Sequence, residues 1–137
     1  MRTVRLTRIY HLCAGHRLYH PGRDDEWNRR VFGKCSHPDG HGHNYRLEVT
    51  LEGTPDGETG RVYPVSTLDE RVEEAVLQPL DHHNLNSVLD LEDGPAPTTE
   101  VLLVEIWKRL AAAIKAPVRL QRLKISETAK NSFEYWE

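Results

Sequence analysis

The sequence has no apolar run near the roughly 20 residues that a membrane-spanning helix needs, and only 38% of its 137 residues are hydrophobic. Its first residues lack the apolar stretch of a secretion signal. Positive charge is not in excess either, because 18 basic and 21 acidic side chains give a net charge of −3. Proteins that bind nucleic acid usually carry a basic stripe. We therefore expect a cytoplasmic protein whose partner is neither a membrane nor a nucleic acid.

Cysteine is scarce, with only Cys13 and Cys35 in the chain. A disulfide between them is not expected in a reducing compartment, so each thiol needs its own explanation. Histidine is abundant by comparison, since six of the eight histidines lie within residues 11–43. The chain length fits one domain, and we expect residues 1–137 to form it.

Residues 3–15 and 43–52 alternate between apolar and polar side chains, as half-buried antiparallel strands do. Arg8 is an exception on the apolar face of the first strand. The connection between them, residues 17–42, is rich in Pro, Gly, Asp and Asn. Long connections of this kind are usually functional or disordered, and we expect a loop there.

Two helices are predicted in the second half of the chain. Thr67 and Glu70 form a capping box for the first helix, and Pro79 stands where that helix should end. Thr98 is the expected N-cap of the second helix. The predicted fold is α+β in the order ββααββ, with both helices on one face of an antiparallel sheet. Its last two strands cover residues 118–127 and 132–136.

Three histidines fall on one predicted face. His41 and His43 are two residues apart at the start of the second strand, so their side chains share its buried side. His16 continues the apolar face of the first strand, and a hairpin of the two strands would bring the three imidazoles together. Three neutral imidazoles with one open position are typical of catalytic Zn²⁺, while Fe²⁺, Co²⁺ and Ni²⁺ stay open as alternatives. The structural alternative is a set of hydrogen-bonded histidines in a turn.

Cys35 lies six residues before His41, where a nearby Zn²⁺ or Lys34 would favour the reactive thiolate. Asp81 can hold the tautomer of the adjacent His82, and a Cys–His–Asp set can move protons. The structural alternatives are an inert loop thiol and a turn that Asp81 caps.

Glu127 shares the predicted face of Leu123 and Ile125, so its carboxylate should point inward. An unpaired charge there is costly. Either a basic side chain pairs with Glu127, or a ligand with paired N–H donors does.

In these motifs the sequence resembles the 6-pyruvoyl-tetrahydropterin synthase family, which includes the bacterial 6-carboxy-tetrahydropterin synthases of queuosine biosynthesis. The resemblance covers nearly the whole chain, and the motifs occur in the family's order. They are Ala14-Gly15-His16, Cys35 through His41-Gly42-His43-Asn44-Tyr45, Leu80-Asp81-His82-His83-Asn84, Pro97-Thr98-Thr99-Glu100 and Ser126-Glu127-Thr128.

The resemblance implies the tunnelling fold, in which subunits join their sheets into a barrel as a hexamer of two trimers. It also implies that His16, His41 and His43 hold Zn²⁺ and that Cys35 is the catalytic thiolate. Asp81 and His82 would be its proton-transfer partners, from the same subunit or a neighbouring one. Glu127 would anchor the pterin by a charge-assisted bidentate contact. Thr98, Thr99 and Glu100 match a segment that helps to form the pterin pocket.

The implied substrate is 7,8-dihydroneopterin triphosphate, from which triphosphate is eliminated. One branch of the family stops at the pyruvoyl product, as in biopterin biosynthesis, and the other loses acetaldehyde to leave the carboxy product. The sequence leaves both branches open. It departs from the family pattern at Arg61, Pro64 and Val101, none of which is a predicted ligand or proton carrier.

Two other functions fit part of the pattern. A three-histidine zinc hydrolase or hydratase would explain the metal ligands but would give Cys35, Asp81-His82 and Glu127 no role. A structural zinc domain would have a closed fourth coordination position and would unfold when a chelator removes the metal.

Overall fold

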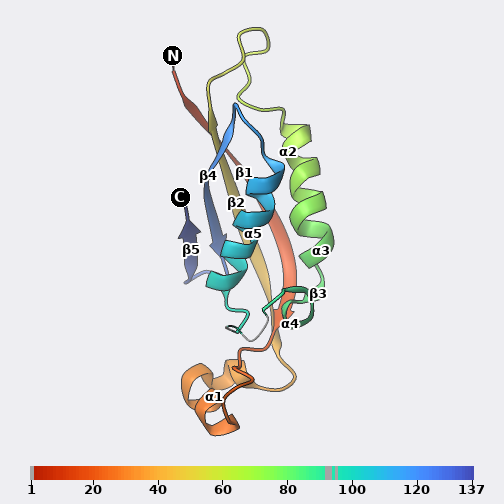
Figure 1. The fold of residues 1–137 in the computed structure, drawn as a ribbon, viewed down its shortest axis with the longest axis vertical. Coiled ribbons are helices and arrows are strands. Elements are labelled where there is room, and N and C mark those ends of the chain that lie inside the picture. Colours follow the sequence, from red (N-terminus) through yellow and green to blue (C-terminus); the bar gives the residue numbers. More distant parts are fainter. Residues whose placement is uncertain (1, 92–93, 95) are drawn as a thin grey trace.

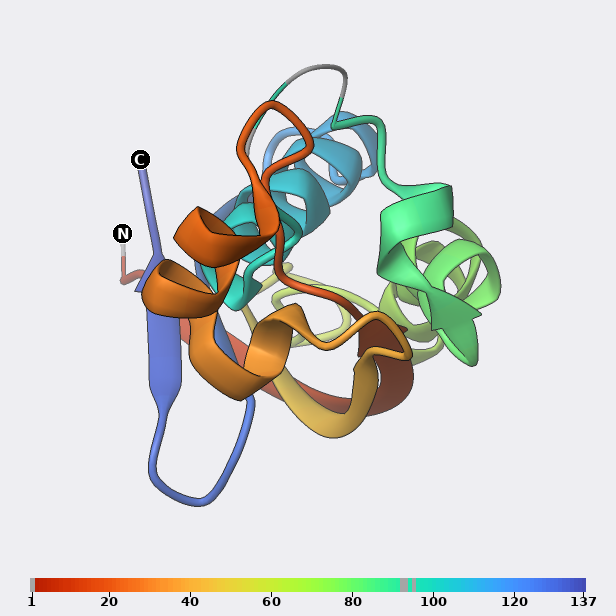
Figure 2. The same ribbon diagram turned by 90° about the horizontal axis from the view of Figure 1, so that it is seen from below.

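The computed structural model describes residues 2–91, 94 and 96–137. A five-stranded sheet in the order β3-β1-β2-β4-β5 forms one layer, and helices cover one of its faces (Figure 1). Seen from below, the sheet curves around α5 and the α2–α3 segment (Figure 2). The strands are β1 Val4–His16, β2 His41–Gly53, β3 His83–Asn84, β4 Arg119–Ser126 and β5 Ser132–Tyr135. The α-helices are α1 Asp25–Phe32, α2 Val65–Val72, α3 Gln78–Leu80, α4 Leu85–Val88 and α5 Thr99–Ala113.

The long antiparallel pairing of β1 with β2 is the centre of the sheet. Its register runs from Val4 opposite Gly53 to His16 opposite His41. The alternation predicted for β2 is confirmed, because Tyr45, Leu47, Val49 and Leu51 are all fully buried. The ββααββ order of the predicted elements is confirmed, with α2 and α5 on one face of the sheet, and α1, β3 and α4 are additional short elements.

The core fills the space between the sheet and the helices. Helix α5 has Thr98 as its N-cap, as predicted, since the Thr98 hydroxyl accepts a hydrogen bond from the Val101 N–H at 3.3 Å. Burial of the apolar side chains of this core supplies the main driving force of folding, about 25 cal/mol per Å² of apolar surface. The apolar stripe of α5 packs on the sheet through Leu103, Ile106, Trp107, Leu110 and Ile114.

The prediction of an unbroken loop over residues 17–42 was wrong. Helix α1 and a 3₁₀ turn, Gly33–Ser36, lie within it, below the end of the sheet (Figure 1). Asp24 caps α1 by accepting from the Trp27 N–H at 2.8 Å, and Gly33 ends it with a φ of 58°. The helix was missed because its eight residues carry no continuous apolar stripe; Val31, for example, is 51% exposed.

The start of the next helix was also predicted wrongly. Thr67 lies inside α2, which begins after Pro64, so the capping box does not form. Proline has its φ already fixed near the helical value, which favours the earlier start. The helical turns end at Leu80, one residue after Pro79, close to the predicted end, and a π-helical turn, Glu73–Leu77, precedes Pro79. A residue without an N–H cannot close an α-helical turn, and the wider turn precedes it.

Arg8, the exception on the apolar face of β1, has a partner on α2. Its guanidinium donates two hydrogen bonds to Asp69, each at 3.0 Å. The Tyr10 hydroxyl donates a third to the same carboxylate at 2.7 Å. These donors, Arg8 first, lower the pKa of Asp69. The cluster ties the edge of the sheet to the helix that covers it.

No helix within the described residues is both long and apolar enough to cross a membrane.

The cluster predicts a pH-dependent contribution to stability. Because the pKa of Asp69 is lowered by folding, its contribution is complete above the ordinary value of 3.8 and is lost as the pH falls through the lowered value. Asp69→Asn should reduce the free energy of unfolding by about 1 kcal/mol at neutral pH, a figure already reduced for solvent screening. Urea unfolding of the variant and wild type across acidic pH checks this. Asp90→Asn is the control. A difference in the free energy of unfolding between wild type and Asp69→Asn that stays constant with pH would contradict the account.

Candidate metal centre and active site

His16, His41 and His43 meet at the end of the β1–β2 pair, as predicted from their parity. One ring nitrogen of each lies within 4.8 Å of the others. The Nε2 atoms of His16 and His41 are 3.0 Å apart. Cross-strand pairing puts His16 opposite His41 and Ala14 opposite His43, so the backbone ladder itself brings the rings together.

A backbone contact fixes the orientation of His16. Its Nδ1 lies 2.8 Å from the carbonyl oxygen of Pro97, which can only accept, so Nδ1 carries the proton. The Nε2 lone pair therefore faces the other two imidazoles. A histidine that ligates a metal commonly donates its other N–H in this way.

The surroundings of His16 and His41 favour the neutral imidazole, the form that binds a metal. Burial is the largest cause that lowers the pKa of His16. The pKa of His41 is lowered by burial and then by the neighbouring His43. The three rings meet edge to face, with centroids 4.6 to 5.1 Å apart. Burial thus favours the metal-binding form of His16 and His41.

Gly40 allows the chain to turn into β2 close to His16. Its φ is 69°, a left-handed conformation that favours glycine. A Cβ at this position would lie 2.9 Å from the His16 carbonyl oxygen. Any other residue at position 40 would push the two strand ends apart and with them two of the three histidines.

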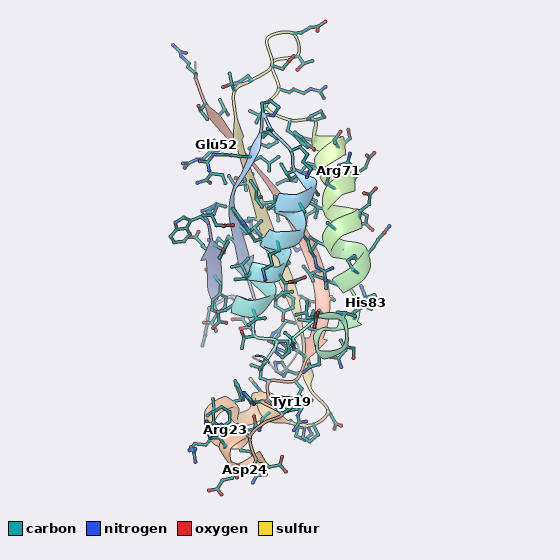
Figure 3. The ribbon with its side chains drawn as sticks, viewed as in Figure 1. Tyr19, Arg23, Asp24, Glu52, Arg71 and His83 are labelled. Carbon is teal, nitrogen blue, oxygen red and sulfur yellow. The ribbon has the colours of Figure 1, made fainter. Side chains whose placement is uncertain are left out.

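The three histidines line a cavity of about 790 Å³ together with His82 and His83. His83 and Tyr19 both line it, and Figure 3 shows His83 near the end of the sheet with Tyr19 below it, closer to α1. The short strand β3 pairs with the end of β1, placing His83 beside Ala14. Residues from the two halves of the chain thus surround one opening.

Asp81 and His82 form a side-chain pair at this edge. The Asp81 carboxylate lies 3.0 Å from His82 Nδ1 and accepts from the Cys13 N–H at 2.7 Å. Burial alone would raise the pKa of Asp81, but the Cys13 and His82 donors outweigh it and lower the pKa. His82 has a φ of 60°, rare for a residue with a Cβ, and its side chain is 79% exposed. A strained, exposed imidazole oriented by a carboxylate suits proton transfer.

Glu127 points inward, as its parity predicts, and is held beside the histidines. Its carboxylate accepts from the Thr99 hydroxyl at 2.7 Å and lies 3.5 Å from His43 Nε2. Behind this pair the Tyr45 hydroxyl is buried and makes no hydrogen bond within the described structure. Burial, and then the charge of Glu127, raise the pKa of Tyr45. The sequence alone did not identify Thr99 as the partner of Glu127, because the contact joins residues far apart in the chain.

The other predicted residues lie at different distances from the cavity. Cys35 is half-buried in the 3₁₀ turn and does not line the cavity of the three histidines. Thr98 serves as the cap of α5. Glu100 is exposed and lines a separate hollow with Leu91 and Lys108. The roles of these three residues stay predictions.

Comparison with known proteins decides the family. The family model described as 6-pyruvoyl tetrahydropterin synthase matches residues 5–137. The chain belongs to this family. It is 41% identical to the 6-pyruvoyl tetrahydrobiopterin synthase of Drosophila melanogaster over 130 residues, covering 95% of this chain and 77% of that protein. The Homo sapiens protein of the same name is 40% identical over 132 residues, 96% of this chain and 90% of that one.

A solved structure supports the same conclusion. The Caenorhabditis elegans 6-pyruvoyl tetrahydropterin synthase superimposes with a TM-score of 0.92 at 32% sequence identity, covering all of this chain and 97% of that one. The predicted resemblance and the α+β class are therefore confirmed for this pterin-synthase family member.

The cluster predicts a metal site that depends on each imidazole. His43→Ala should weaken Zn²⁺ binding at least about 100-fold, because loss of an outer partner alone costs about 10- to 100-fold in affinity. Competition with a chelating dye measures this. His11→Ala is the matched control, since His11 is exposed on the same strand pair. Unchanged affinity of His43→Ala would exclude the three-histidine site.

Proposed function

We propose that the chain is a zinc-dependent lyase that eliminates triphosphate from 7,8-dihydroneopterin triphosphate and yields 6-pyruvoyl-tetrahydropterin. The observation that carries the proposal is the position of the Glu127–Thr99 pair directly beside the three histidines. The Glu127 carboxylate can bind the N–H groups of a nitrogen heterocycle. The three histidines can hold a metal ion next to the side chain of that heterocycle. The curated relatives, named 6-pyruvoyl tetrahydrobiopterin synthases, favour the pyruvoyl product over the carboxy product.

The donor set fits zinc, because three neutral imidazoles leave one coordination position for a substrate oxygen. When bound, Zn²⁺ would supply Lewis-acid chemistry that acidifies the side-chain hydroxyls and the C–H groups next to them. His16, held by Pro97, fixes the direction of the donor set. In the proposal, the cavity around the cluster holds the substrate side chain next to the exposed His82, which lines it.

Two groups of this chain move the protons in the proposal. His82, oriented by Asp81, takes and returns a proton at its Nε2 atom, since Nδ1 faces the carboxylate. The Cys35 thiolate removes the second proton. Cys35 lies in the turn just before β2, whose first residues are two of the metal ligands. A neighbouring subunit's Asp81–His82 pair serves equally well in this scheme.

Subunit assembly is part of the proposal. The helices leave one face of the sheet uncovered (Figure 2), and Ile9 on that face is 45% exposed. Trp136, next to the edge strand β5, is 64% exposed. Exposed apolar groups in such positions favour association between subunits. We propose a homo-hexamer built from two trimers, in which the sheets of the subunits join into a barrel.

The product test is direct. The zinc-loaded protein, incubated with 7,8-dihydroneopterin triphosphate, should release triphosphate and the pyruvoyl product without acetaldehyde, as mass spectrometry detects. Cys35→Ala should lower kcat by about 100- to 10,000-fold while keeping its zinc. Cys13→Ala is the matched control for the thiol.

Each other outcome has a distinct meaning. A carboxy product with acetaldehyde would move the chain to the queuosine-type branch. A fully active Cys35→Ala would favour a zinc hydrolase or hydratase. Unfolding on metal removal, with no turnover of the substrate, would favour a structural zinc domain.

The anchoring role of Glu127 gives a separate prediction. Glu127→Gln replaces a charged acceptor by an amide that has only one acceptor oxygen, so the KM should rise about 10- to 100-fold. Steady-state kinetics with varied substrate measure this, and Glu58→Gln in an exposed turn is the control. A variant with wild-type KM would mean that the carboxylate does not bind the pterin.

A further inference from the structure

A second hollow, of about 470 Å³, lies next to the histidine cavity. Arg17 and Pro38 line both, so the two spaces share a wall. The second hollow extends from this wall along α1, where Arg29 and Lys34 line it. In the proposed function, Glu127 accounts for the pterin and the three histidines for the metal, and neither group accounts for the phosphate arm of the substrate.

The hollow is positively charged. Arg17, Arg29 and Lys34 line it, against one carboxylate, that of Asp25. None of the three cations forms an ion pair with a carboxylate in the part of the chain that the structure describes. In contrast, Arg5, Arg8 and Arg119 elsewhere on the surface do. Unpaired guanidinium and ammonium groups around one concave space are the side chains that bind phosphate.

Polar contacts of Arg17 and Asn28 fix part of the wall of the hollow. Arg17 donates through Nε to the Ser36 carbonyl at 2.8 Å, and its guanidinium stacks 4.1 Å from the centre of the Tyr19 ring. This leaves its terminal nitrogens for another acceptor. Asn28, only 3% exposed, accepts from the His20 N–H and donates to three carbonyl oxygens of the loop before α1. Arg17 is therefore held in place, and the backbone before α1, the helix that carries Arg29, is fixed by Asn28.

We infer that this hollow, defined by Arg17, Arg29 and Lys34, binds the polyphosphate arm of the substrate. The inference rests on the proposed function for the identity of that substrate. Arg17 joins the two spaces and directs the arm out of the histidine cavity, while Arg29 and Lys34 neutralise its far phosphates. The site gives the chain its preference for a triphosphate over the unphosphorylated pterin.

Arg29 and its neighbour Arg30 provide a matched pair of variants. Both are exposed, but Arg29 lines the hollow, whereas Arg30 lines a different space. The double variant Arg29→Ala/Lys34→Ala should raise the KM for 7,8-dihydroneopterin triphosphate about 10-fold or more and should leave binding of 7,8-dihydroneopterin unchanged. Arg30→Ala should match wild type in both. Raising the salt concentration should reduce the difference between the double variant and wild type.

A binding assay separates this inference from the proposed function. Inorganic tripolyphosphate is titrated into the metal-free full-length protein, because the anion chelates zinc, and the heat of binding is measured. We expect affinity that falls about 10-fold in the double variant and not in Arg30→Ala. If that loss is seen but no form turns over the substrate, the phosphate site stands and the proposed function fails. If the wild type is active and the double variant keeps its KM and its tripolyphosphate affinity, the phosphate site is refuted.

Discussion

The register of β1 against β2 is the constraint on which the site depends. Pairing His16 with His41 also fixes Ala14 opposite His43 and Leu12 opposite the buried Tyr45. Because side chains alternate between faces, a slip of one residue would move His41 and His43 to the opposite face from His16. The apolar residues that follow on β2 prevent that slip, since it would expose them to water. The same hydrophobic pattern that builds the core thus aligns the metal ligands.

Side-chain bonds to the backbone hold the rest of the site against the end of β1. Asn86 accepts from the Arg17 N–H at 2.8 Å and donates to the Arg17 carbonyl at 2.9 Å. The Cys13 backbone does the same for the next turn, donating to Asp81 and accepting from the His82 N–H. These bonds replace the ladder that a strand as short as β3 cannot provide. These hydrogen bonds place the Asp81–His82 pair beside the histidine cavity, although the pair is distant in sequence from the three histidines.

The elements with strong periodicity were predictable, and those set by a few local contacts were not. Strand β2 follows from its alternation, and the meeting of the three histidines follows from strand parity. Helix α1 has start and stop signals in Asp24 and Gly33, but it lacks the apolar stripe that would have made them convincing. The start of α2 was misplaced because Pro64 outweighed the Thr67 pattern. The bond of Thr99 to Glu127 depends on how α5 docks on the sheet, which no local pattern specifies.

The most direct test of the account is the coordination of the bound metal. X-ray absorption spectroscopy of the zinc-loaded protein measures the ligand atoms and their distances without any substrate. The account predicts three imidazole nitrogens at about 2.0–2.1 Å and one oxygen from water, with no sulfur. A sulfur ligand at about 2.3 Å, or a fourth protein ligand that closes the site, would contradict it.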